Sequence, residues 1–131
     1  MDKYKVVIVD DDEVALKKLS IELRKNPYFS LDGTARNGKQ GEKLITKIQP
    51  DLLFLDVEMP DMTGLDLLHD LHDNISWGMR VVFYTAYEKY MIHAIRESVF
   101  DYLLKSFEGQ ELKNILTRFM AQMETCLLYT S

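Results

Sequence analysis

Acidic side chains directly follow two apolar stretches of this chain. Residues 6–9 (VVIV) run into the acidic residues 10–12 (DDD), and residues 52–55 (LLFL) run into Asp56. Short apolar runs bounded by polar or turn residues are typical of strands that are buried on both faces of a parallel sheet. Because open α/β sheets bind their ligands at the carboxyl ends of the strands, we expect these carboxylates to lie together at that edge.

A hydroxyl and an amine end two further strand-like stretches. Residues 80–85 (RVVFYT) end in Thr85, and residues 100–104 (FDYLL) are followed by Lys105. Two carboxylates about 4 Å apart repel by roughly 4 kcal/mol at an effective dielectric of about 20, so they must share a proton, bind a cation or accept a cationic side chain. An all-oxygen site with room for water suits Mg²⁺. A carboxylate flanked by a hard cation, a lysine and a hydroxyl is well arranged to attack a phosphorus atom.

Each of these residues also has a purely structural interpretation. The acidic residues 10–12 can cap a helix, and Asp56 can be a turn residue. Thr85 can be an ordinary strand residue and Lys105 a solvated lysine. Taken singly, the structural interpretations are favoured. Taken together they require four strands to place acid, acid, hydroxyl and amine at one edge by accident, so the sequence favours a functional site.

The elements that must position these residues alternate along the chain. Strands are expected at 4–9, 29–35, 52–55, 80–85 and 100–104, with the 29–35 strand at an edge because Asp32 and Gly33 interrupt it. The apolar stripes of five helices lie between and after them: Leu16, Leu19, Leu23; Gly41, Leu44, Ile45, Ile48; Leu65, Leu68, Leu71; Met91, Ile95, Val99; and Leu112, Ile115, Leu116, Phe119, Met120, Met123. The alternation predicts an α/β fold, with a five-stranded parallel sheet and five helices on both faces. The expected strand order is 2-1-3-4-5, which is a common order of doubly wound sheets and does not follow from the alternation itself.

Composition limits the class of protein. The chain has 131 residues, of which 47% are hydrophobic and 28% charged, as expected for one globular domain. Its net charge of -5 argues against direct binding to nucleic acid, which needs a basic face. Apolar runs this short exclude a membrane span, and the single cysteine, Cys126, fits a reducing cytoplasm.

Together these motifs resemble the receiver domains of two-component response regulators. The most specific are residues 9–11 (VDD), 55–64 (LDVEMPDMTG), 85–86 (TA) and 101–105 (DYLLK), and the resemblance extends from Lys5 to about Met123. It implies a flavodoxin-like receiver fold. It also implies a phosphorylation switch that is not an enzyme, beyond its own phosphotransfer and slow autodephosphorylation. Phe83 to Tyr87 and the 102–105 stretch look most like receivers of LytTR-type DNA-binding regulators.

The resemblance implies a role for each acidic residue. Asp56 would accept a phosphoryl group from a phosphohistidine on a sensor histidine kinase. Asp11, Asp56 and the backbone carbonyl of Glu58 would bind Mg²⁺, and Asp10 would assist through a water molecule.

The resemblance also implies roles on the other flank of the site. Thr85 would bond the phosphoryl group and Lys105 would pair with it. Tyr102 would be an aromatic switch that turns inward when Thr85 is drawn to the phosphoryl group, although a half-buried strand tyrosine is its ordinary structural interpretation. Glu58 and Tyr87 would border the route of the hydrolysing water and tune the lifetime of the phosphorylated state.

One residue departs from the family pattern. Receivers usually have a proline in a cis peptide after the lysine, whereas this chain has Ser106. A cis bond before a residue other than proline costs about 2.5–4 kcal/mol. We therefore expect the Lys105–Ser106 peptide to be trans, with the lysine still reaching Asp56.

We interpret residues 1–124 as the receiver and 125–131 as a tail or the start of a linker to an absent output domain. The expected output is transcription, with DNA contacted only through that absent domain and no membrane contact. Phosphorylation is expected to promote a homodimer through the face of the fourth helix, fifth strand and fifth helix, where charges of both signs gather: Glu88, Lys89, Arg96, Glu97, Asp101, Glu111, Lys113 and Arg118.

Two other classes remain open. A phosphatase with an aspartyl-phosphate intermediate would typically carry Asp-x-Asp after its first strand, whereas here Asp56-Val57-Glu58 follows the third. A non-phosphorylated interaction module would have no need of the acids, hydroxyl and amine together.

Overall fold

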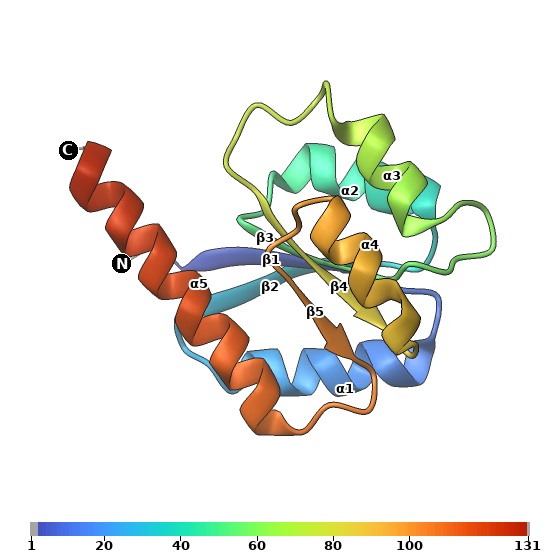
Figure 1. Cartoon of the computed structure of the whole chain (residues 1–131), viewed down its shortest axis with the longest axis horizontal. Helices are drawn as coiled ribbons and strands as arrows, with labels where there is room; N and C mark the ends of the chain where they lie inside the picture. The colour runs from blue at the N-terminus through green and yellow to red at the C-terminus, as the bar shows by residue number, and fades with distance from the viewer. Residues whose placement is uncertain (1–2, 131) are drawn as a thin grey trace.

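The computed structural model describes the chain from residue 3 to residue 130, with side chains to residue 125. Cys126 therefore lies outside the described side chains. The strands are β1 (Tyr4–Val9), β2 (Phe29–Ala35), β3 (Leu52–Leu55), β4 (Arg80–Thr85) and β5 (Asp101–Leu104). They pair in parallel in the order β2-β1-β3-β4-β5, as predicted, with β2 at an edge (Figure 1).

Helices cover both faces of this sheet (Figure 1). They are α1 (Glu13–Arg24), α2 (Gly38–Ile48), α3 (Gly64–Leu71), a 3₁₀ turn η1 (Glu88–Tyr90) with α4 (Met91–Arg96), and α5 (Gly109–Thr130). Two buried clusters result, because successive strand residues point to opposite faces. One contains Leu19, Phe54 and Phe119 with α1 and α5, and the other contains Ile45 and Leu67 with α2 and α3.

Polar residues in the loops fix where the helices begin. The Asp12 side chain accepts hydrogen bonds from the backbone N–H groups of Val14 and Ala15 at 3.1 and 3.3 Å, so Asp12 rather than Asp11 caps α1. Thr63 and Asp66 form a capping box at the start of α3. The α1 cap leaves the Asp11 side chain free for the site.

The fourth helix differs from its predicted stripe. α4 ends at Arg96, so Val99 lies beyond it, and Ile95 is 72% exposed instead of buried. Ala94 is the residue that α4 buries. The chain leaves the helix through Ser98, whose φ of 55° is left-handed, and β5 begins at Asp101 rather than Phe100. The predicted burial of Met91 and Ile95 is therefore wrong, and both contribute to an apolar surface.

The long α5 follows its predicted stripe. Leu112, Ile115, Leu116 and Phe119 are buried, and Met120 and Met123 are partly buried against the same cluster. No helix in the described part of the chain has both the length and the apolar character needed to cross a membrane.

Candidate functional site

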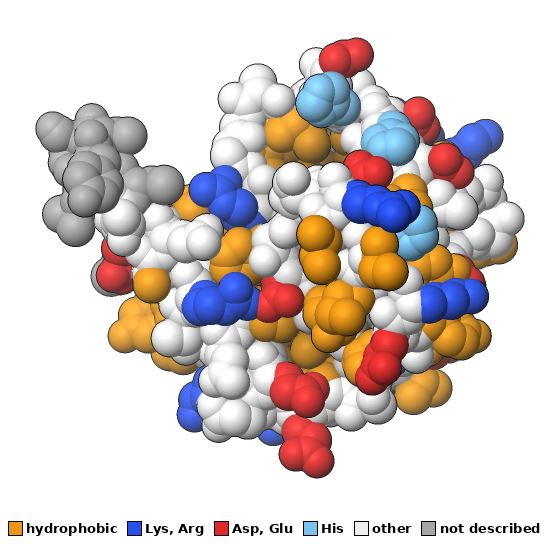
Figure 2. Space-filling model, viewed as in Figure 1, with side chains coloured by type: hydrophobic (Ala, Val, Ile, Leu, Met, Phe, Trp, Pro, Cys, Tyr) orange, Lys and Arg blue, Asp and Glu red, His pale blue; other side chains and the backbone are white. Residues whose placement is uncertain are grey.

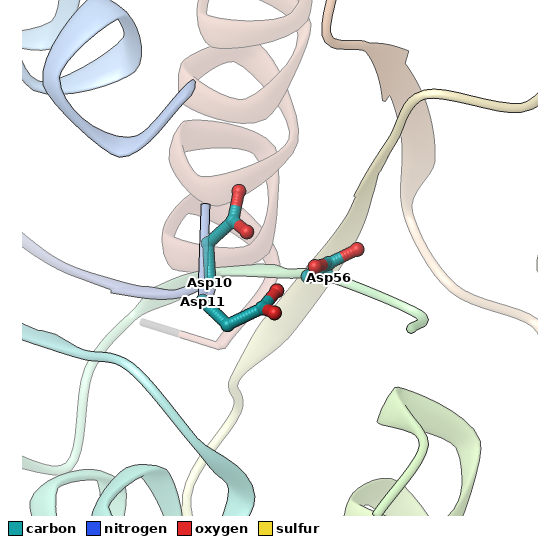
Figure 3. Close-up of side chains that lie close together, drawn as sticks. All are labelled: Asp10, Asp11 and Asp56. Atoms are coloured by element: carbon teal, nitrogen blue, oxygen red, sulfur yellow. The ribbon is translucent and has the colours of Figure 1, made fainter. Parts of the chain in front are cut away.

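The backbone places Asp10 and Asp56 side by side where β1 and β3 end. The Asp56 N–H donates to the carbonyl of Val9 at 2.9 Å, and the Asp10 N–H donates to the carbonyl of Ala35 at 2.9 Å. Asp10, Asp11 and Asp56 each present a carboxylate oxygen, and these oxygens lie within 4.8 Å of one another (Figure 3). The expected meeting of three carboxylates is therefore present.

Lys105 reaches the same carboxylates from the end of β5. Its Nζ lies 3.0 Å from Asp10 Oδ1, 3.4 Å from Asp56 Oδ2 and 3.9 Å from Asp12 Oδ2. The Lys105 side chain is 15% exposed, and the structure has no cis peptide in its described residues, so the Lys105–Ser106 bond is trans. Both parts of that prediction are confirmed.

Burial and crowding disfavour the charged form of Asp56. Burial, reinforced by the Asp10 carboxylate, raises the pKa of Asp56 to about 8, and the opposing charge of Lys105 offsets only part of this. Burial acts to lower the pKa of Lys105. Its hydrogen bond to Asp10 and the charge of Asp56 outweigh burial, so its pKa is raised. Lys105 therefore stays cationic beside these acids.

The carboxylates fit a hard divalent cation. Asp10 is fully buried, yet its Oδ2 is the one side-chain nitrogen or oxygen atom among the described residues that is buried without a hydrogen-bond partner. An unpaired buried carboxylate oxygen is costly, and an ion or its water would satisfy it. The cluster offers only oxygen ligands beside an open cavity, the donor set that Mg²⁺ prefers.

Thr85 lines the same cavity as Asp56 and Lys105. Its carbonyl accepts from the Lys105 N–H at 2.8 Å, which ties the ends of β4 and β5 together. Its hydroxyl oxygen accepts from the Tyr87 N–H at 3.2 Å, which leaves the hydroxyl hydrogen free to donate. These groups open onto a cavity of about 380 Å³ lined by Asp11, Asp12, Asp56, Glu58, Met59, Pro60, Thr85, Ala86, Tyr87 and Lys105.

A tight turn after β3 holds Asp56 in place. The Glu58 N–H donates to Asp56 Oδ1 at 3.3 Å, and the Gly64 N–H closes the turn onto the Val57 carbonyl at 2.8 Å. A Cβ at Gly64 would lie 2.4 Å from the Asp56 carbonyl oxygen. Glycine at 64 is therefore required by the close approach of α3 to the Asp56 backbone.

The rim of the cavity contains a contact that the sequence did not predict. The Tyr90 hydroxyl donates to Glu58 Oε1, and this bond raises the pKa of Tyr90 to about 12. Lys89 Nζ stands 5.0 Å from the Tyr87 ring centroid and 5.1 Å from that of Tyr90. Tyr90 therefore links Glu58 to a cluster of Tyr87, Lys89 and Tyr90 beside the cavity. The only sequence signal was the Tyr-x-x-Tyr spacing, which is too common to identify them.

Tyr102 lies on the α4 side of the sheet rather than in the cavity. It is half-buried against the cluster that contains Phe83 and Ala94, and its partner across the strands is Phe83. This position fits both the switch role and the ordinary structural interpretation.

Three comparisons with known proteins agree with this geometry. Residues 6–117 match the family model described as "Response regulator receiver domain". The chain is 36% identical over 114 residues to the transcriptional regulatory protein BtsR of Escherichia coli K12, covering 87% of this chain and 47% of BtsR. It is 34% identical over 116 residues to an uncharacterized response regulatory protein of Vibrio cholerae, covering 88% of this chain and 48% of the relative.

The solved structures agree in fold. The response regulatory domain of mrkE from Klebsiella pneumoniae has a TM-score of 0.82 at 25% identity, covering 92% of this chain and 98% of that domain. The REC domain of AraT from Geobacillus stearothermophilus has a TM-score of 0.81 at 26% identity, covering 93% and 96%.

The chain therefore belongs to the response regulator receiver family, whose members are phosphorylation-dependent switches and not a family of enzymes. It spans about half the length of the curated relatives it matches. Their names do not bear on the finer likeness to LytTR-type regulators, which stays a prediction.

Proposed function

We propose that Asp56 is the phosphorylated residue, and that it takes its phosphoryl group from a phosphohistidine of a sensor histidine kinase. The main support is the site geometry in a chain of the receiver family. Carboxylate oxygens of Asp10, Asp11 and Asp56 lie within 4.8 Å of one another, and Lys105 Nζ lies 3.4 Å from Asp56 Oδ2. Asp56 has the central position, because β3 is the middle strand and its end faces the cavity.

The transfer requires an ionised Asp56. One carboxylate oxygen attacks the phosphorus atom, and a P–O bond forms as the P–N bond breaks and the electron pair leaves with the imidazole. Lys105 and the free hydrogen of Thr85 would donate to the phosphoryl oxygens. Asp11, Asp56 and the Glu58 carbonyl, with Asp10 through water, would hold Mg²⁺. When bound, Mg²⁺ would offset the negative charge of the acids and the phosphoryl group.

Incubation with acetyl phosphate and Mg²⁺, followed by intact mass measurement, tests this assignment. One phosphoryl group per chain is expected on the wild type, and Asp56→Asn should take none because it lacks the nucleophilic oxygen. Asp73→Asn, at an exposed acid of the α3–β4 loop, is the matched control and should label fully. Full labelling of Asp56→Asn would disprove the assignment. Continuous turnover would favour a phosphatase, and no labelling an interaction module.

We further infer that phosphorylation acts through Tyr102 on the face of α4, β5 and α5 to control transcription. BtsR, a relative about twice as long as this chain, is named a transcriptional regulatory protein. DNA would be contacted by a second domain, since this chain has a net charge of -5. The single cysteine supports a cytoplasmic location. Autodephosphorylation would be slow and influenced by Glu58 and Tyr87.

The α4–β5–α5 face has an apolar centre that supports association of two copies. Met91, Ile92 and Ile95 are 40%, 55% and 72% exposed, and Figure 2 shows apolar side chains gathered over α4. Several of the charges expected to join the copies are paired within one chain. Arg118 binds Asp101 at this face, and Glu97 binds His69 of α3 at 3.1 Å. We therefore propose that apolar contacts, with charges at the rim, hold a phosphorylated homodimer.

A further inference from the structure

A lysine of α1 contacts the turn that carries Lys105. Lys18 Nζ donates to the backbone carbonyl of Lys105 at 2.8 Å and to that of Phe107 at 2.7 Å. The same ammonium stands 4.1 Å from the centroid of the Phe107 ring. Lys18 is half-buried, so these contacts are partly shielded from water. Hydrogen bonds from an ammonium are stronger than neutral ones, and two on one turn constrain its shape.

Backbone hydrogen bonds and the buried Phe107 ring hold the two ends of this turn, and Lys18 adds bonds to its carbonyl groups. The Phe107 N–H closes it onto the Leu104 carbonyl at 2.9 Å, with Lys105 and an exposed Ser106 at its corners. Serine leaves φ free where a proline would lock it. The direction in which the Lys105 side chain leaves the backbone depends on this turn, and its ammonium must stay near Asp10 and Asp56.

α1 is also anchored to the sheet beside this turn. The Tyr84 hydroxyl donates to the Ala15 carbonyl at 2.8 Å, and Tyr84 is fully buried on β4. The Phe107 ring packs at 6.0 Å from the Tyr84 ring. Lys18 lies about one helical turn after Ala15, on a part of α1 that is anchored to the sheet. Its hydrogen bonds can therefore hold the Lys105–Phe107 turn in a fixed position relative to the sheet.

We propose that Lys18 is a positioning residue for Lys105 and so sets the rate at which Asp56 is phosphorylated. The inference rests on the proposed function of Asp56. The hydrogen bonds of the Lys18 ammonium go to backbone carbonyls and not to the carboxylates, so it would act through the Lys105 backbone. The carboxylates are placed by β1 and β3, so Mg²⁺ binding should not depend on Lys18.

The test is Lys18→Met, which keeps the length of the side chain and removes the donor. With acetyl phosphate and saturating Mg²⁺, we expect its labelling rate to fall about tenfold, since small misplacements of a catalytic group cost this much or more. Lys18→Arg, which can still donate to both carbonyls, should recover most of the rate. Lys17→Met, an equal loss of charge at an exposed neighbour on α1, should label as the wild type does.

Two measurements distinguish a positioning role of Lys18 from a role in fold stability alone. The affinity for Mg²⁺ should be the same in Lys18→Met and the wild type, and labelling is measured well below each variant's melting temperature. If Lys18→Met does not fold, Lys18→Gln takes its place. In a Lys105→Ala background, Lys18→Met should cause no further slowing, because the residue through which it acts is gone.

Three outcomes overturn the inference. The first is labelling of Lys18→Met at the wild-type rate. The second is equal slowing by Lys18→Met with and without Lys105, and the third is slowing of Lys17→Met to the same extent. In each case wild-type labelling and its loss in Asp56→Asn leave the proposed function standing. Failure of the wild type to label would instead overturn the proposed function, and the role of Lys18 with it.

Discussion

At the scale of single residues, Asp56 is held where its charged form is unfavourable. Burial and the neighbouring Asp10 raise its pKa, while its proposed chemistry needs the ionised carboxylate. A divalent cation would resolve this conflict, because it favours the carboxylates that it binds. On the proposed function, a cation and a phosphoryl group would both occupy this site, and the cation would relieve the repulsion among its carboxylates.

The raised pKa of Asp56 predicts a pH dependence of stability in EDTA. Burial and Asp10 raise the pKa of Asp56 to about 8 in the folded protein, whereas the pKa of an aspartate in an unfolded chain is about 4. The folded state should therefore bind more protons between these values. The stability that this proton contributes is complete below pH about 4 and is lost as the pH rises through about 8. We expect the melting temperature in EDTA to fall over this range.

Asp56→Asn is the control for this titration. Its melting temperature should depend less on pH, since the amide has no proton to lose. Saturating Mg²⁺ should have the same flattening effect in the wild type. An equal slope in the wild type and in Asp56→Asn, measured by thermal denaturation in EDTA, would rule out Asp56 as the titrating group.

The proposed role of Asp11 as a Mg²⁺ ligand predicts how Mg²⁺ changes the melting temperature. A ligand that binds only the folded protein stabilises it by about 2.7 kcal/mol at one hundred times its Kd. Mg²⁺ should therefore raise the melting temperature of the wild type by several degrees, and should not do so in Asp11→Ala. Asp73→Ala should retain the full gain. A gain in Asp11→Ala equal to that of the wild type would exclude Asp11 as a ligand.

At the scale of elements, the turn from β3 to α3 affects both the stability of the fold and the position of Asp56. A methyl group at Gly64 would collide with the Asp56 carbonyl oxygen at 2.4 Å and press on Leu55 at 3.1 Å. Gly64→Ala should lower the free energy of unfolding by about 1–3 kcal/mol, as overpacking does. It should also slow phosphorylation, because relief of the clash moves the Asp56 backbone.

Gly78→Ala is the matched control for this turn. Its added Cβ would meet only Arg80 Nη1, at 3.8 Å, so a change below about 0.5 kcal/mol is expected. Urea denaturation and the labelling assay measure both effects. If Gly64→Ala is as stable as Gly78→Ala and labels at the wild-type rate, α3 does not constrain the site in this way.

At the scale of the whole molecule, the exposed apolar centre of α4 predicts association. Sedimentation should show a dimer when beryllofluoride is added as a phosphoryl mimic, and a monomer without it. Ile95→Lys should prevent the dimer, since a lysine would be buried unpaired in the apolar contact. Arg118→Glu should weaken it less, because Arg118 is already paired with Asp101.

Ile21→Lys is the control for the association test. Ile21 is 58% exposed on α1, away from α4, and its replacement should leave the dimer intact. Unchanged mass on adding beryllofluoride, or dimerisation of Ile95→Lys equal to that of the wild type, would remove this face from the proposal.

The sequence by itself determined the sheet and the residues at its edge. The apolar and β-branched runs predicted the bounds of β1, β2, β3 and β4 to the residue, and those of β1, β3 and β4 lead into acids or end in a hydroxyl. The strand order was expected as a common order of doubly wound sheets, and the structure confirms it. Burial on both faces of a parallel sheet leaves so strong a local pattern that the candidate site residues could be predicted from the strand ends.

Only the tertiary structure decided what surrounds that edge. The exposure of Ile95, the Tyr90 bond to Glu58 and the Lys18 contacts with the Lys105 turn could not be read from the chain. Lys18 and Lys105 are 87 residues apart, and a periodic pattern reports only which face of an element is apolar. Which carbonyl a side chain reaches depends on how whole helices dock on the sheet, and that is settled by the packing of the entire core.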